Sequence, residues 1–164
     1  MKITKFLRTV LVVLTGSALL GGTARTSVAA PDKNMTRFVA HLGVTNYCFH
    51  HWVAKPYREG KFVVGAPHRT ASIVKAGSAL LFAVRELKAA YKIAAESNDK
   101  TLRNVSAALV SVTNSFTSIG RKFKAGKFSP GDVESLNGSF SQLDSSVRAG
   151  HLEVKDVAVT VPGT

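Results

Sequence analysis

The sequence predicts an all-α protein, organised as a single domain arranged like a four-helix bundle. Three segments carry apolar residues at alternating steps of three and four, which is the period of an amphipathic helix. A fourth segment follows the same period less regularly, and short turns separate all four. Four such helices stabilise each other by burying their apolar stripes against one another.

The first 29 residues have the pattern of a secretory signal peptide. Lys2, Lys5 and Arg8 give a positive start, residues 10–20 are almost wholly apolar, and small residues lead up to Ala29. The apolar run is about half the length of roughly 20 residues that a membrane-spanning helix needs. We therefore expect cleavage after Ala29 and a protein that is secreted or periplasmic.

The remaining chain has the size of one domain, which we place at residues 30–150, followed by an extended tail at 151–164. The leader holds four of the 22 Lys and Arg, so 18 remain against 10 Asp and Glu, a net charge of +8. Such a charge favours an anionic membrane surface, an envelope polymer or an acidic protein, with binding that weakens as salt rises. Export argues against nucleic acid as the partner.

The first helix is expected at residues 32–55. Apolar residues including Phe38 and Leu42 align on one face, but polar Thr45 and Asn46 interrupt the stripe. The helical pattern is therefore weaker here than in the other segments.

The second helix is expected at residues 67–97, with Pro67 in its first turn, where a missing N–H leaves no bond unmade. The third is expected at 99–126, with Asp99 as its N-cap. Its outer face is rich in Ser, Thr and Asn, which are mediocre helix formers, so packing must stabilise it.

The last helix is expected at residues 129–150. Ser129, Pro130 and Asp132 supply the N-cap, first-turn and N3 groups of a helix start, and Gly150 suits its end.

Two segments outside the helices are rich in β-branched residues, residues 61–65 and the tail at 151–164. They could pair as a short β-ribbon beside the helices. Alternatively, the tail could be an exposed strand that pairs with a partner, or it could be frayed.

The end of the third helix carries the candidate binding surface, in which cations alternate with aromatic residues. The surface consists of Arg121, Lys122, Phe123, Lys124, Lys127 and Phe128. In one interpretation the cations only complement the negative end of the helix dipole. In the functional interpretation they meet an anionic surface while the phenylalanines dip into it or dock on it.

Residues 41–52 gather three of the five histidines, the only cysteine and the only tryptophan. They suggest an alternative function, a small haem or metal carrier centred on His41, Cys48 and His51, with Trp52 beside an apolar slot. A tetrahedral metal site within this helix is disfavoured, because His41 and Cys48 lie roughly 10 Å apart along the axis. The structural interpretation is a histidine at the border of the core and a buried cysteine.

An enzyme is the third possibility, with Cys48 as nucleophile, but no catalytic motif accompanies this residue. A lone cysteine could instead be free or link a homodimer. We therefore expect a non-enzymatic binding protein without a cofactor, with haem binding as the alternative.

Overall fold

The computed structural model describes residues 32–164, so the expected signal peptide lies outside the described part. The expected all-α fold class is confirmed for this part of the chain. Its helical elements are α1 (Lys33–Phe49), a π-helical turn η1 (His50–Ala54), α2 (Lys55–Arg58), α3 (Arg69–Glu96), α4 (Lys100–Lys124) and α5 (Pro130–Ala149). Within residues 32–164, no helix is long and apolar enough to span a bilayer.

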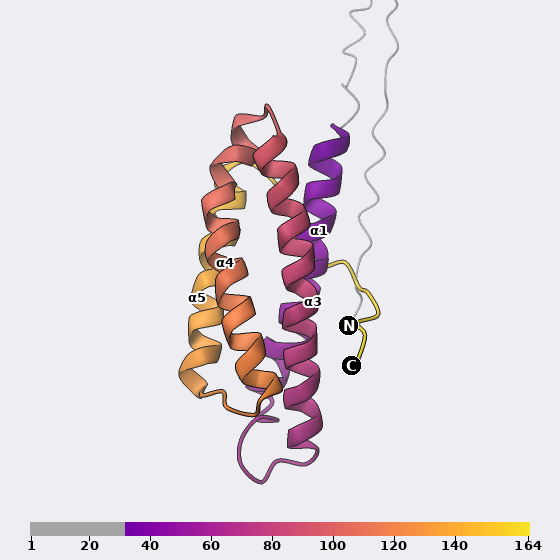
Figure 1. Ribbon diagram of the computed structural model, residues 1–164, viewed down its shortest axis with the longest axis vertical. Helices are drawn as coiled ribbons and strands as arrows, with labels where there is room; N and C mark the ends of the chain where they lie inside the picture. The colour runs from indigo at the N-terminus through magenta and orange to yellow at the C-terminus, as the bar shows by residue number, and fades with distance from the viewer. Residues whose placement is uncertain (1–31) are drawn as a thin grey trace, which may run out of the picture. The chain divides into compact units, whose positions relative to one another are not determined.

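The long helices pack in chain order, α1 on α3, α3 on α4 and α4 on α5 (Figure 1). Aromatic contacts also join the last helix to the first. The Phe49 ring stacks on Phe140 with centroids 4.8 Å apart and lies 5.9 Å from Phe116 of α4. One continuous core therefore connects all four long helices.

The expected caps are present at most helix starts. The Asp99 carboxylate accepts hydrogen bonds from the backbone N–H groups of Thr101 and Leu102 at 2.7 and 3.2 Å. The expected role of Pro67 is wrong, because α3 begins at Arg69 after an N-cap at His68 with φ of 55°. His68 has the left-handed backbone conformation, and Pro67 lies in the turn that precedes the helix.

The first helix does not end near residue 55 but changes its winding there. The Lys55 N–H donates to the carbonyl of His50, five residues back, so η1 is wider than an α-helix. Pro56 supplies the physical reason, because its ring would clash with the Trp52 carbonyl of a regular helix. The wider turn also rotates His51 and the residues after it away from the positions that a uniform 100° step predicts.

Thr45 interrupts the apolar stripe without cost because its hydroxyl has a partner. The side chain is fully buried, and its Oγ1 donates to the His41 carbonyl at 3.0 Å. A buried hydroxyl bonded within its own helix avoids the penalty of an unpaired polar group.

The possible β-ribbon does not form in the described residues. Residues 61–65 fold into turns, with Val63 donating to the Gly60 carbonyl at 3.2 Å, and the tail contains no strand. The tail instead packs against its own helices, where Val157 donates to the Gly43 carbonyl at 2.9 Å and Val161 is buried. Because Val161 is buried against the helical core, the tail gains more from this contact than from pairing with residues 61–65.

Replacing Gly43 by alanine should release the tail from α1. The new methyl group would contact the Lys155 carbonyl and lie 2.6 Å from Val157 Cγ2. We expect faster amide exchange at Val157, because the substitution disrupts its bond to residue 43. Hydrogen exchange followed by NMR measures this change.

Gly138 of α5 provides the matched control, since a Cβ there meets no atom within 4 Å. Gly138→Ala should stabilise the protein by about 0.5–1 kcal/mol through helix propensity alone. Equal stabilisation by Gly43→Ala, with Val157 still protected, would show that the tail does not dock at Gly43.

Candidate functional site

Nine of the 18 Lys and Arg residues of the described chain lie at one end of the helical domain. There the α2–α3 loop, the start of α3 and the α4–α5 turn come together (Figure 1). We call this end the basic pole and define it by its cations. They are Lys55, Arg58, Lys61, Arg69, Lys75, Arg121, Lys122, Lys124 and Lys127. All are exposed except Arg69, which is half-buried.

The two phenylalanines of the expected binding surface, Phe123 and Phe128, pack within the domain. Phe123 is fully buried, and Phe128 is half-buried and stacks on it with ring centroids 4.3 Å apart. Phe62 packs edge-on against both rings at 5.4 and 5.5 Å. The physical reason is that Phe123 continues the buried stripe of α4, while the next turn folds Phe128 back onto it. These ring contacts join the α2–α3 loop to the α4–α5 turn.

The four cations of the expected surface differ in their surroundings. Arg121, Lys124 and Lys127 are exposed and form no ion pair within residues 32–164. Lys122 instead donates to the Asp132 carboxylate at 2.6 Å. Its charge is therefore largely compensated inside the protein.

The Asp132 carboxylate also fixes the start of α5. It accepts hydrogen bonds from the Ser129 backbone N–H at 2.8 Å and from the Ser129 hydroxyl at 2.9 Å. The Lys122 ammonium first, and then the Ser129 donors, hold the pKa of Asp132 below its ordinary value against the opposing effect of desolvation. The same carboxylate thus caps a helix and positions a cation of the basic pole.

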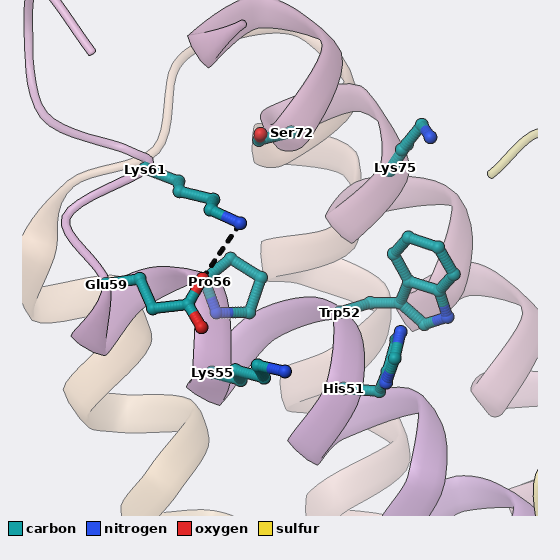
Figure 2. Close-up of a pocket in the computed structure, with 8 residues that line it drawn as sticks. All are labelled: His51, Trp52, Lys55, Pro56, Glu59, Lys61, Ser72 and Lys75. Atoms are coloured by element: carbon teal, nitrogen blue, oxygen red, sulfur yellow. Dashed lines mark ion pairs between the residues drawn. The ribbon is translucent and has the colours of Figure 1, made fainter. Parts of the chain in front are cut away.

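A pocket of about 230 Å³ opens beside α2, where it is lined by three lysines of the basic pole (Figure 2). Lys55 and Lys61 come from α2 and the loop, and Lys75 comes from the first turns of α3. Lys75 Nζ lies 5.7 Å from the centre of the Trp52 ring, a cation–π contact. The carboxylate in the pocket is Glu59, which pairs with Lys61 at 2.8 Å. The pocket is therefore a positively charged hollow with one aromatic wall.

Sequence reasoning missed five of the nine cations of this surface. Lys55, Arg58, Lys61 and Arg69 fall within fifteen residues that contain one carboxylate, Glu59. That local excess of positive charge was the available signal. Because this segment follows α1 and the expected patch ends α4, only the fold places them together.

The residues of the proposed carrier site do not converge. His41 Nδ1 lies 2.7 Å from the Glu86 carboxylate, whereas Cys48 is fully buried in the core. His51 is exposed and stacks on Tyr47 with centroids 5.0 Å apart. Trp52 is half-buried and faces His51 edge-on at 4.8 Å.

Phe38 and Phe49, which lie on the same helix as His41 and Cys48, are buried in the hydrophobic core. Residues 32–164 contain no group of three His, Cys, Asp or Glu side chains placed to hold a metal. The Nε1 atom of Trp52 is buried and has no hydrogen-bond partner within the described residues.

The Cys48 thiol is held in its neutral form. Burial, and secondly the negative charge of Glu86, raise its pKa to about 12. A thiolate is needed for nucleophilic attack or metal ligation, so neither is favoured at neutral pH. A disulfide to a second chain would also require the helices to open, since the sulfur lies inside the core.

The comparisons with known proteins give no relative. No protein-family model, curated protein or solved structure matches this chain.

Cys48 should resist thiol reagents in the folded protein at pH 8, because its pKa lies far above that pH and no solvent reaches it. Ellman's reagent should release one equivalent of thiolate only after the protein is unfolded in guanidinium. Rapid labelling of the native protein would contradict both the burial of Cys48 and its raised pKa.

Replacing Asp132 by asparagine should lower the free energy of unfolding by about 1 kcal/mol at pH 7, the usual cost of a lost helix cap. Because the pKa of Asp132 is lower in the folded protein than in the unfolded chain, its ionised carboxylate stabilises the fold. This stabilisation is fully present above the ordinary carboxyl pKa of about 3.9 and is lost as the pH falls through the pKa of the folded state. Urea unfolding at pH 7 and pH 3 measures it. If the parent protein and the asparagine variant differed in free energy of unfolding by the same amount at both pH values, the ionic role of the carboxylate would be contradicted.

Proposed function

We propose that the exported chain is a non-enzymatic binding protein that attaches to anionic surfaces through its basic pole. The observation that carries this proposal is the uneven distribution of charge. The basic pole holds nine of the 18 cations but only three of the 10 carboxylates, which are Glu59, Asp132 and Glu134. It therefore carries +6 of the net +8.

The pole presents most of this charge to solvent. Two of its three carboxylates are paired with its own lysines, Glu59 with Lys61 and Asp132 with Lys122. The other seven cations form no ion pair within the described residues. A concentrated positive field of this kind attracts anionic surfaces and orients the protein as it approaches them.

The alternative functions receive less support from the geometry. A nucleophilic role for Cys48 is disfavoured by its raised pKa and burial. A carrier role would need His41, Cys48 and His51 to share one cavity, and they lie in three different environments. The basic pole, by contrast, is formed by residues that the fold gathers from three helices, α2, α3 and α4, and from the segments that follow α2 and α4.

Partial neutralisation of the basic pole should weaken binding to anionic vesicles. Each lysine near such a surface contributes about 1 kcal/mol, so Lys124→Gln/Lys127→Gln should reduce the partition coefficient about 30-fold at low salt. The test uses a chain that starts at Ala30, because the apolar leader would itself bind lipid, and residues 31–164 form a compact unit. Sedimentation with phosphatidylglycerol vesicles measures the partitioning.

The matched control is Lys33→Gln/Lys100→Gln, which removes the same charge from the opposite end of the domain. Both lysines are exposed, at the starts of α1 and α4 (Figure 1). This control should bind nearly as well as the parent protein, and higher salt should weaken all binding. Equal losses in the two variants would show that overall charge, and not the basic pole, determines attachment.

A further inference from the structure

The loop between α2 and α3 presents two adjacent apolar side chains to solvent. Val64 is 92% exposed and Val63 is 60% exposed, more than any other large apolar side chain in residues 32–164. They are the two middle residues of the α2–α3 loop, called the tip below, and this loop lies at the end of the domain where the basic pole is located (Figure 1). Neither valine contributes to the hydrophobic core.

The loop that carries these valines is anchored to the domain. Phe62, the residue before them, is only 5% exposed and packs against Phe123 and Phe128. Arg69 Nε donates to the Phe62 carbonyl at 2.9 Å. The valines are thus exposed to solvent next to Phe62, which is anchored in the core.

Turn hydrogen bonds define the tip itself. Val63 donates to the Gly60 carbonyl and Ala66 donates to the Val63 carbonyl, both at 3.2 Å. Gly60 and Gly65 flank the tip with φ of 70° and 86°, a conformation that other residues rarely adopt. Because the turn is already formed, docking through the valines would not require ordering a flexible segment.

The charges around the tip complement an anionic lipid surface. Arg58 and Lys61 precede the valines and Arg69 follows them. The end of α4 and the turn after it add Lys124 and Lys127. In an interfacial site, apolar side chains enter the acyl boundary while the long stems of basic residues let their charges stay among the headgroups. A water-soluble polyanion offers no apolar phase for the valines. The combination of exposed valines and neighbouring cations therefore favours a bilayer.

We propose that Val63 and Val64 insert into the interfacial region of an anionic bilayer while the surrounding cations bind its headgroups. This inference rests on the proposed function, since it names the anionic surface that the basic pole binds. It assigns two roles within one surface. The cations bring the protein to the membrane, and the valines distinguish a membrane from a charged polymer.

The first test replaces both valines by serine and compares two anionic probes. Val63→Ser/Val64→Ser should reduce partitioning into phosphatidylglycerol vesicles about tenfold, because it removes the apolar transfer free energy of two side chains. Its affinity for soluble polyphosphate should stay within twofold of the parent protein. Circular dichroism checks that the variant keeps its helices, as expected for exposed side chains.

The second test measures insertion directly and does not depend on affinity. A bimane probe on Val64→Cys should shift its emission to shorter wavelength with vesicles and be quenched by nitroxide-labelled lipid. The same probe on Val110→Cys, an exposed position on α4, should show neither effect. Cys48 is buried and should not take up the label.

The outcomes separate this inference from the proposed function. If the serine variant binds vesicles as well as the parent protein and the probe at position 64 stays in water, insertion is overturned. The proposed function still stands in that case if Lys124→Gln/Lys127→Gln loses binding. If the serine variant loses polyphosphate binding equally, the valines do not distinguish lipid and the inference also fails. Absence of binding to both probes by the parent protein would overturn both.

Discussion

The contact of Phe62 with Phe123 and Phe128 is the interaction on which the basic pole depends. It joins the α2–α3 loop to the α4–α5 turn, two segments that are about sixty residues apart in the chain. Without it, the cations of the loop and those of α4 would belong to separate surfaces. These rings therefore hold the loop cations and the exposed valines close to the cations at the end of α4.

Gathering positive charges at one end has a cost that the aromatic contact outweighs. Two exposed cations 4 Å apart repel each other by about 1 kcal/mol in water, and salt screens wider separations. Full burial of a phenylalanine contributes about 1.5–3 kcal/mol, and paired rings add about 0.5–1.5 kcal/mol. Glu59 and Asp132 offset further repulsion by pairing with Lys61 and Lys122. The fold thus tolerates a cluster of positive charges at one end of the domain.

The histidine and cysteine residues of α1 and η1 lie close together in the sequence but have separate structural roles. His41 pairs with Glu86, Cys48 fills the core, and His51 stacks on Tyr47. Helical periodicity places such residues on faces but does not say which neighbouring element covers each face. The π-helical turn before Pro56 also changes which face each following residue lies on, because the rotation per residue there differs from the 100° of a regular α-helix.

The sequence by itself determined the all-α class, the caps at Asp99 and Ser129 and the approximate helix limits, because these depend on residues close together in the chain. It also located one half of the candidate surface, at the end of α4. Tertiary structure decided that Phe123 and Phe128 are buried, that Lys55, Lys61 and Lys75 share a pocket, and that Val63 and Val64 lie beside the same charges. Those outcomes depend on which distant segments pack together, and local periodicity contains no information about that pairing.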